Sequence, residues 1–150
     1  MARRRRLGRV VVDTSVLIRG VRAFRQRRLT PPHTPELQLI LAWRDEPAVF
    51  TWLYSQAILT EYREILRRLK VPRHAAGRFL NLLSQAGEEV TEPVSGEFSP
   101  DPKDDPFYHC ALAGDADYII TDNVRDFPLI PGRKRPRIST PQTAVGLLAL

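Results

Sequence analysis

Acidic and amide side chains that could do chemistry stand directly behind two apolar runs of the sequence. Asp13 follows Val10–Val12, and a later run ends in Thr121, Asp122 and Asn123. In open parallel sheets the working residues lie just beyond the carboxyl ends of the strands. We therefore expect these side chains to meet at one edge of a sheet, in a crevice that can hold a cation. A helix N-cap is the alternative role for Asp13.

Glu61 is an acidic residue on the border of a predicted apolar helix face. The apolar residues between Gln56 and Lys70 recur at helical spacing. Because a carboxylate is costly to desolvate alone, Glu61 is expected to have a partner, either a cation site or an arginine such as Arg68. Glu64 lies nearly opposite the apolar face and is predicted to face solvent and pair with Arg68.

Three further aspartates, Asp101, Asp104 and Asp105, precede a helix predicted over Phe107–Ala113. The pair Asp105-Pro106 suits the N-cap and the first position of that helix. One cap does not need three carboxylates. Two acids crowded at a helix start therefore indicate a metal that neutralises them.

The residue patterns required for several other kinds of functional site do not occur in the sequence. The single cysteine, Cys110, excludes an internal disulfide and a cysteine-cluster zinc site. The three histidines show no metal-binding spacing, no serine stands in a glycine-rich elbow, and no glycine-rich nucleotide-binding pattern occurs.

Positive charge is concentrated at the start of the chain. The net charge is +6, yet residues 1–28 hold ten arginines and one acid, while the rest holds 13 basic and 16 acidic residues. The segment from Asp101 to Asp126 carries seven aspartates opposed by Lys103 and Arg125. A basic arm attracts phosphates, whereas the acidic patch repels them unless a cation lies between.

Short apolar strands alternate with amphipathic helices, a pattern typical of a parallel sheet covered on both faces. At 150 residues and 43% hydrophobic composition, one domain over residues 1–150 with a basic arm (1–9) is expected. No apolar run approaches the ~20 residues that cross a bilayer, so a cytoplasmic protein without membrane contact is predicted. The predicted strands are 7–12, 49–54, 88–94, 118–121 and 137–139, and the predicted helices are 16–24, 36–44, 56–70, 74–86, 107–113 and 144–150.

Four short motifs, in this order along the chain, resemble the PIN-domain family, most closely its toxin components of bacterial and archaeal toxin–antitoxin pairs. The likeness runs from about Arg9 to Pro128. The motifs are Val-Val-Val-Asp13-Thr-Ser, Leu59-Thr-Glu61-Tyr-Arg-Glu-Ile-Leu, Asp101-Pro-Lys-Asp104-Asp105-Pro-Phe and Ala116-Asp-Tyr-Ile-Ile-Thr121-Asp-Asn123-Val-Arg-Asp126-Phe-Pro.

The resemblance implies a metal-dependent ribonuclease on an α/β/α sandwich with a mainly parallel sheet. Asp105 matches the family aspartate that opens the later helix, with Asp104 as its possible substitute, and Asn123 stands where many members carry an aspartate. The implied catalytic residues are Asp13, Glu61, Asp105 and Asn123, and the implied metal ligands are Asp13, Glu61, Asp104, Asp105, Asp122 and Asp126.

Mg²⁺ or Mn²⁺ is the expected cofactor, because these ions take oxygen ligands and keep several waters. RNA is the expected substrate, with Ser15, Thr121, Arg3, Arg4, Arg5 and Arg6 assigned to substrate binding. The arginines could instead dock an acidic segment of a small antitoxin protein. The resemblance also favours a homodimer.

Rival functions differ in identifiable residues. A non-catalytic RNA-binding or scaffolding domain with an incomplete site is the main alternative, because Asn123 replaces an acid. A metal-dependent phosphatase usually has Asp-x-Asp after its first strand, which Asp13-Thr14-Ser15 lacks. A phospho-receiver domain needs a partner lysine, for which the chain offers no clear candidate.

Overall fold

The central sheet has five strands, and all its neighbouring pairs are parallel. The computed structural model describes residues 6–25, 33–91 and 95–150. The strand order is β3-β2-β1-β4-β5. Their bounds are β1 Arg9–Val12, β2 Thr51–Tyr54, β3 Glu88–Glu89, β4 Tyr118–Ile120 and β5 Arg137–Ser139. The predicted strand over 88–94 is thus two residues long, and residues 92–94 lie outside the described part of the chain.

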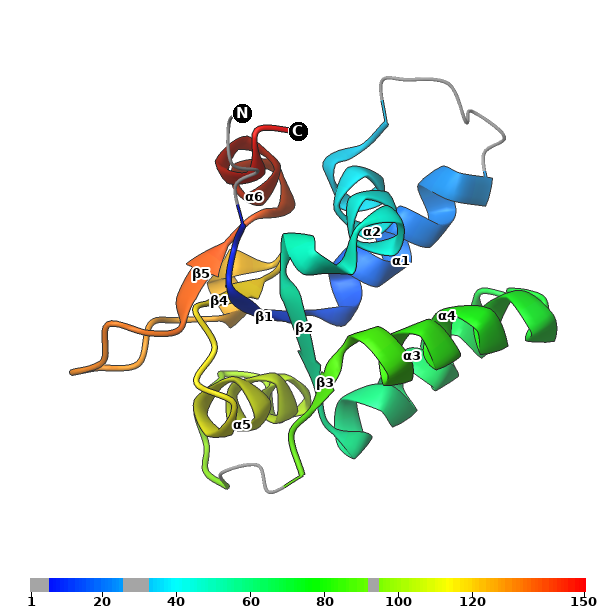
Figure 1. The fold of residues 1–150 in the computed structure, drawn as a ribbon. Helices are drawn as coiled ribbons and strands as arrows, with labels where there is room; N and C mark the ends of the chain where they lie inside the picture. The colour runs from blue at the N-terminus through cyan, green and yellow to red at the C-terminus, as the bar shows by residue number, and fades with distance from the viewer. Residues whose placement is uncertain (1–5, 26–32, 92–94) are drawn as a thin grey trace.

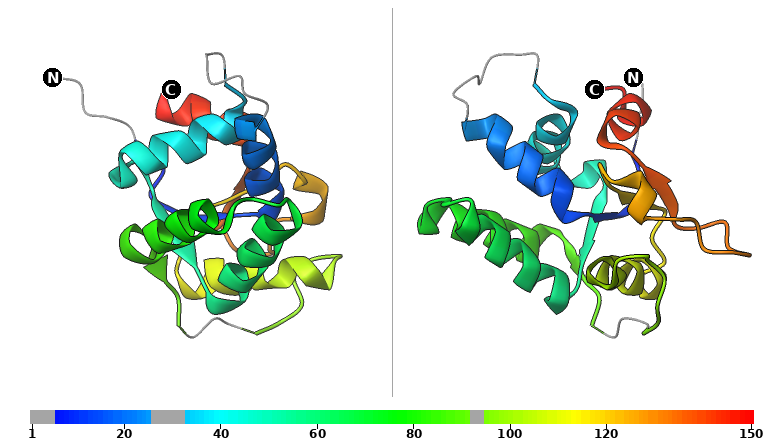
Figure 2. Two further views of the ribbon diagram at one scale, coloured as in Figure 1. Left: turned by 90° about the vertical axis from the view of Figure 1, so that its right-hand side faces the viewer. Right: turned by 180° about the vertical axis from the view of Figure 1, so that it is seen from behind.

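Six α-helices in the described residues cover the sheet. They are α1 Thr14–Arg25, α2 Pro35–Asp45, α3 Gln56–Arg68, α4 Arg73–Ala86, α5 Asp105–Ala113 and α6 Pro141–Leu148. Figure 1 shows α1, α2 and α6 on one side of the sheet and α3, α4 and α5 on the other. The views in Figure 2 keep α1 and α2 opposite α3 and α4. The predicted α/β/α sandwich is therefore confirmed.

Helix starts follow directly from local sequence. Thr34 caps α2 by accepting from the Leu37 N–H at 3.3 Å, and Pro35 fills the first helical position, where no N–H is needed. Ser55 caps α3 in the same way, accepting from the Ile58 N–H at 3.3 Å. Because Ser55 follows β2 at once, α3 begins beside the carboxyl edge of the sheet.

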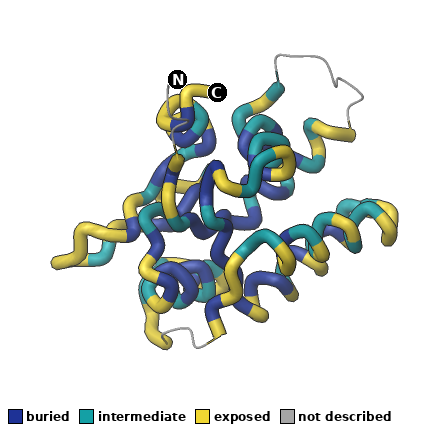
Figure 3. The backbone as a smooth tube through the Cα atoms, viewed as in Figure 1, coloured by how far each residue is buried: buried dark blue, intermediate teal, exposed yellow. Residues whose placement is uncertain are grey.

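The core lies along β1, β2 and β4 and the helix faces that pack on them (Figure 3). Val10 and Val11 of β1 are fully buried and stand in register with Trp52 and Leu53 on one side and Tyr118 and Ile119 on the other. Each large apolar side chain buried in this way contributes about 1.5–3 kcal/mol. No helix among the described residues is both long and apolar enough to span a bilayer.

The chain changes direction across the sheet at β1. It runs from β1 outward to β2 and β3, then returns to β4 and β5 on the other side. Ligands of open α/β sheets bind where the strand order reverses, beyond the carboxyl ends of the strands. That point lies between β1 and β4, where the N–H of Asp13 donates to the carbonyl of Ile120 at 2.9 Å.

Candidate active site

Asp13 is the central residue of the carboxyl edge. It is only 4% exposed, and its Oδ2 accepts from the Ser15 hydroxyl at 2.7 Å and from the Thr121 hydroxyl at 2.8 Å. Burial raises its pKa, against these hydrogen bonds and those of the Thr14 and Ser15 amides, which favour the charged form. Ser15 and Thr121, assigned to substrate from sequence, therefore hold the Asp13 carboxylate in place.

The same two hydroxyls join the ends of β1 and β4. Ser15 Oγ accepts from the Asp122 N–H at 3.2 Å, and Thr121 Oγ1 accepts from the Asn123 N–H at 2.9 Å. Asn123 itself is exposed at this edge. The turn after β4 is thus fixed relative to Asp13.

Glu61 reaches the site from α3. Its Oε1 accepts from the Thr14 hydroxyl at 2.8 Å. The next residue, Tyr62, is fully buried, donates its hydroxyl proton to the Val12 carbonyl and accepts from Trp52 Nε1 at 3.3 Å. This contact binds α3 to the last residue of β1 and so sets the position of Glu61. Burial raises the pKa of Glu61, with a smaller contribution from the charge of Asp13.

The arginine partner considered for Glu61 is engaged elsewhere. Arg68 Nε donates to Glu64 Oε1 at 3.1 Å, which confirms the predicted surface pair. Among the described residues no ion pair joins Glu61 to an arginine. Its carboxylate is therefore held by a neutral hydroxyl.

Asp104 and Asp105 are neighbours with different surroundings. Asp105 is 7% exposed, and its Oδ1 accepts from the amides of Phe98 and Ser99, both at 2.8 Å. It begins α5, whereas Asp104 is the N-cap residue and makes no side-chain capping bond. The expectation that Asp105 is the N-cap is therefore wrong, because Asp105 is the first helical residue and its carboxylate holds the preceding loop. Its role as a metal ligand or catalytic residue stays a prediction.

Asp104 belongs to the carboxylate cluster. Burial raises its pKa to about 7, and the charges of Asp13, Asp101, Asp126 and Glu61 add to the increase. These acids come from four separate segments of the chain. The structure therefore brings Asp13, Glu61, Asp101 and Asp126 within electrostatic reach of Asp104 and places the Asp105 carboxylate on the loop amides.

Glu36 is a site residue that sequence reasoning did not assign. It lies in the first turn of α2, is 7% exposed, and approaches the carboxyl group of Asp122. Burial raises the pKa of Asp122, the Glu36 carboxyl adds to the increase, and Arg19, 3.7 Å away, opposes it. The Asp122 Oδ2 atom is buried and accepts no hydrogen bond from the described residues. An acid in the first turn of a helix is explained by the helix dipole alone, so no pattern in the sequence singles out Glu36.

The candidate ligands are of the chemical type that a hard divalent cation prefers. All the candidate ligands are carboxylates, burial together with neighbouring acids raises the pKa values of Asp104 and Asp122, and the Asp122 Oδ2 atom has no hydrogen-bond donor among the described residues. Within the described residues no three acids converge closely enough to hold a metal by themselves. Mg²⁺ commonly uses only one or two protein carboxylates, completing its shell with water and substrate phosphate.

The arginines assigned to substrate do not all lie in the described structure. Arg3, Arg4 and Arg5 fall outside it. Arg6 is exposed and precedes β1, so it lies at the amino edge of the sheet, opposite the carboxylates.

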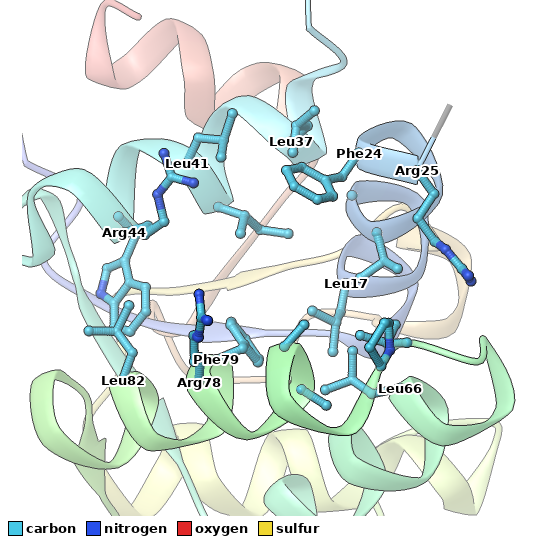
Figure 4. Close-up of a pocket in the computed structure, with 18 residues that line it drawn as sticks. Leu17, Phe24, Arg25, Leu37, Leu41, Arg44, Leu66, Arg78, Phe79 and Leu82 are labelled. Atoms are coloured by element: carbon cyan, nitrogen blue, oxygen red, sulfur yellow. The ribbon is translucent and has the colours of Figure 1, made fainter. Parts of the chain in front are cut away.

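A second feature is an apolar groove of about 820 Å³ between the helix pairs α1–α2 and α3–α4. Figure 4 shows Phe24 and Leu37 on one wall and Leu66 and Leu82 on the other. The arginines that also line the groove are Arg25, Arg44 and Arg78.

Comparison with known families agrees with this geometry. The family model described as PIN domain matches residues 9–125, which is more than half of the chain and includes Asp13, Glu61, Asp104 and Asp122. No curated protein sequence matches the chain.

Proposed function

The chain belongs to the PIN-domain family, whose fold is that of metal-dependent nucleases, and from that premise we propose that it is a divalent-metal-dependent endoribonuclease. The observation that carries the proposal is the carboxylate cluster at the switch point of the sheet, where burial and neighbouring acids raise the pKa values of Asp104 and Glu61 and no ion pair among the described residues joins Glu61 to an arginine. Such a cluster has an unfavourable charge of its own, which a divalent cation would neutralise.

Asp13, Glu61 and Asp104 are the candidates from which one or two carboxylates would hold Mg²⁺ or Mn²⁺, with water and substrate phosphate completing the shell. The bound ion would lower the pKa of a water and offset the charge of a phosphodiester. Ser15 and Thr121 fix the rotamer of Asp13, and Thr14 fixes Glu61. These hydroxyls restrict the orientation of the two carboxylates, as outer partners of metal ligands generally do.

The test is RNA cleavage with Mg²⁺ or Mn²⁺, comparing the unmodified protein with Asp13→Asn and Glu61→Gln. Glu64→Gln is the matched control, because Glu64 lies on the same helix and pairs only with surface arginines. We expect cleavage to be lost in the first two variants and kept in the control, with circular dichroism unchanged. Cleavage that survives both substitutions would assign the activity to a contaminant.

The competing function is a non-catalytic RNA-binding domain. Asn123 in place of an acid and the lack of three converging acids among the described residues favour it. RNA binding without cleavage by the unmodified protein, over a full titration of both metals, would establish that function instead.

A toxin role is the finer part of the proposal, and the apolar groove supports it. Arg78 lines the groove and is exposed, and Arg25 and Arg44 lie at its borders. An amphipathic helix with acidic flanks, carried by a small antitoxin protein, matches both the apolar walls and the positive charge.

Expression in cells tests this role. Growth arrest should be relieved by the product of a small neighbouring gene, and Phe24→Arg should abolish relief while keeping the arrest, because Phe24 lies on the groove and is 49% exposed. Light scattering of the purified protein tests the expected homodimer. If Phe24→Arg instead separates a dimer, the groove holds a second copy.

A further inference from the structure

The amino edge of the sheet carries a cluster of cations that the carboxylate site does not use. We call it the amino-edge patch; it consists of Arg6, Lys134, Arg135 and Arg137. These residues surround a pocket of about 750 Å³, with Asp117 and Tyr118 on its wall. Lys134 comes from the connection between β4 and β5, which extends away from the body of the protein in Figure 1.

The single acid of this pocket is already neutralised. Asp117 accepts from the Arg9 N–H at 2.8 Å and from Arg135 at 2.9 Å, and these bonds hold its pKa below the usual range. A side chain at Gly8 would come within 2.3 Å of Asp117 Oδ2, so the chain enters β1 in close contact with this carboxylate. The charges of Arg6, Lys134 and Arg137 therefore remain uncompensated by Asp117.

These three cations are exposed, and no ion pair engages them within the described ranges of the chain. A surface that gathers positive charge around a concave pocket attracts a polyanion. Tyr118 adds a half-buried aromatic ring to the same wall. Cations beside an aromatic ring are typical of surfaces that bind single-stranded nucleic acid, since the cations contact phosphates and the ring stacks on a base.

The patch and the carboxylate cluster are separated by the length of the sheet. The patch lies at the starts of β1, β4 and β5, whereas Asp13 and Asp122 lie after the ends of β1 and β4. At about 3.3 Å per residue, the path from Gly8 to Asp13 spans roughly 16 Å. A phosphate held at the patch therefore cannot be the phosphate that lies among the carboxylates.

We propose that the amino-edge patch is a second RNA-binding site, which holds the backbone of a single-stranded segment remote from the bond that is cleaved. The proposal rests on RNA being the substrate. It implies that the patch contributes to the binding of a long RNA and is not needed for a dinucleotide, which cannot reach both edges.

The experiment measures the binding of a labelled, unstructured long RNA by fluorescence anisotropy in a chelator, so that no cleavage occurs. The variant Lys134→Ala/Arg137→Ala is compared with Arg63→Ala/Arg73→Ala, a control of equal charge change at exposed positions on α3 and α4. Two lost phosphate contacts weaken single-strand binding by about tenfold at physiological salt and reduce the salt slope by about 1.4. The control should bind as the unmodified protein does.

A patch variant that binds as tightly as the unmodified protein overturns the proposal, and so does an equal loss in both variants, because binding would then follow net charge alone. Cleavage of a dinucleotide should be the same with and without the patch; an equal loss of dinucleotide and long-RNA cleavage also overturns it. If the unmodified protein binds RNA through the patch but never cleaves it, the proposed nuclease activity fails while the binding site stands.

Discussion

The pKa values of aspartates are shifted in opposite directions at the two edges of the sheet. At the amino edge, Asp117 is bound by Arg135 and a backbone amide, and its pKa is lowered. At the carboxyl edge, burial outweighs the hydrogen bonds of Asp13 and raises its pKa, and burial together with neighbouring acids raises the pKa of Asp104. The acid of the amino edge is thus neutralised by the protein's own groups, whereas the buried acids of the carboxyl edge favour protonation and would be stabilised in their charged form by a bound cation.

The largest effect that would test this difference is expected from Asp104→Asn. We expect RNA cleavage to fall by at least about a hundredfold, the upper end of losses from groups that only support metal ligands. The folded state should keep its stability, because this carboxylate is repelled by its neighbours. Initial cleavage rates and a urea titration measure both. Full activity in this variant would remove Asp104 from the site.

Asp105→Asn, one residue along, is expected to act on stability. Its carboxylate accepts hydrogen bonds from two backbone amides, and hydrogen bonds to a charged acceptor contribute about 1.5–3 kcal/mol each. Because an amide oxygen can still accept, we expect the free energy of unfolding to fall by about 2 kcal/mol. Urea unfolding measures it. A variant that unfolds normally but cannot cleave RNA would return Asp105 to the catalytic group.

Thr14→Val removes the only hydroxyl that bonds Glu61 in the described structure and keeps the shape of the side chain. We expect cleavage to fall by about tenfold, the lower end of the losses from groups that orient metal ligands. Rescue by Thr14→Ser would show that the hydroxyl, and not packing, is responsible. An unchanged metal requirement and rate in the valine variant would contradict this role.

The pH dependence of stability should differ between the edges. The pKa of Asp104 is about 7 in the folded protein, against an ordinary value of 3.8, so between these values the folded state holds a proton that the unfolded state has lost. The contribution of Asp104 to the free energy of unfolding therefore falls as pH rises from about 4 to about 7. The fall is expected to be on the order of 1 kcal/mol, because solvent screens the charge of a partly exposed group.

Urea unfolding in a chelator across this pH range measures the fall, and Asp104→Asn should reduce it. Addition of Mg²⁺ at the upper end should restore stability, since a ligand of the folded state stabilises it by mass action. Stability that rises steadily with pH in the chelator would contradict the raised pKa.

The smallest effect belongs to the amino edge. Arg135→Ala leaves Asp117 with its backbone donor, and the lost ion pair is largely exposed. We expect less than about 1 kcal/mol of destabilisation, measured by thermal unfolding at low and high salt. A larger loss would mean that the stability of this edge depends on the specific ion pair between Arg135 and Asp117.

Strand polarity made much of the fold and part of the site predictable. The run Val10–Val12 and the acid behind it correctly placed Asp13 at the carboxyl end of a central strand, and helical periodicity separated Glu61 from Glu64. These inferences succeed because they depend on local periodicity and on a rule that all parallel strands obey.

Residue roles that depend on contacts with distant loops could not be predicted from the sequence. Asp104 and Asp105 are chemically identical neighbours, and the amides of Phe98 and Ser99 decide between them. Glu36 meets Asp122 only because α2 packs beside the turn after β4. Neither fact leaves a periodic pattern in the sequence.

The central position of β1 also affects when activity can arise during synthesis. Asp13 lies near the start of the chain, but its hydroxyl partner Thr121 is 108 residues downstream. An emerging chain can pair β1 with β2 early, whereas β4 must leave the ribosome before the cluster can form. The proposed nuclease activity could therefore arise only after β4 has left the ribosome.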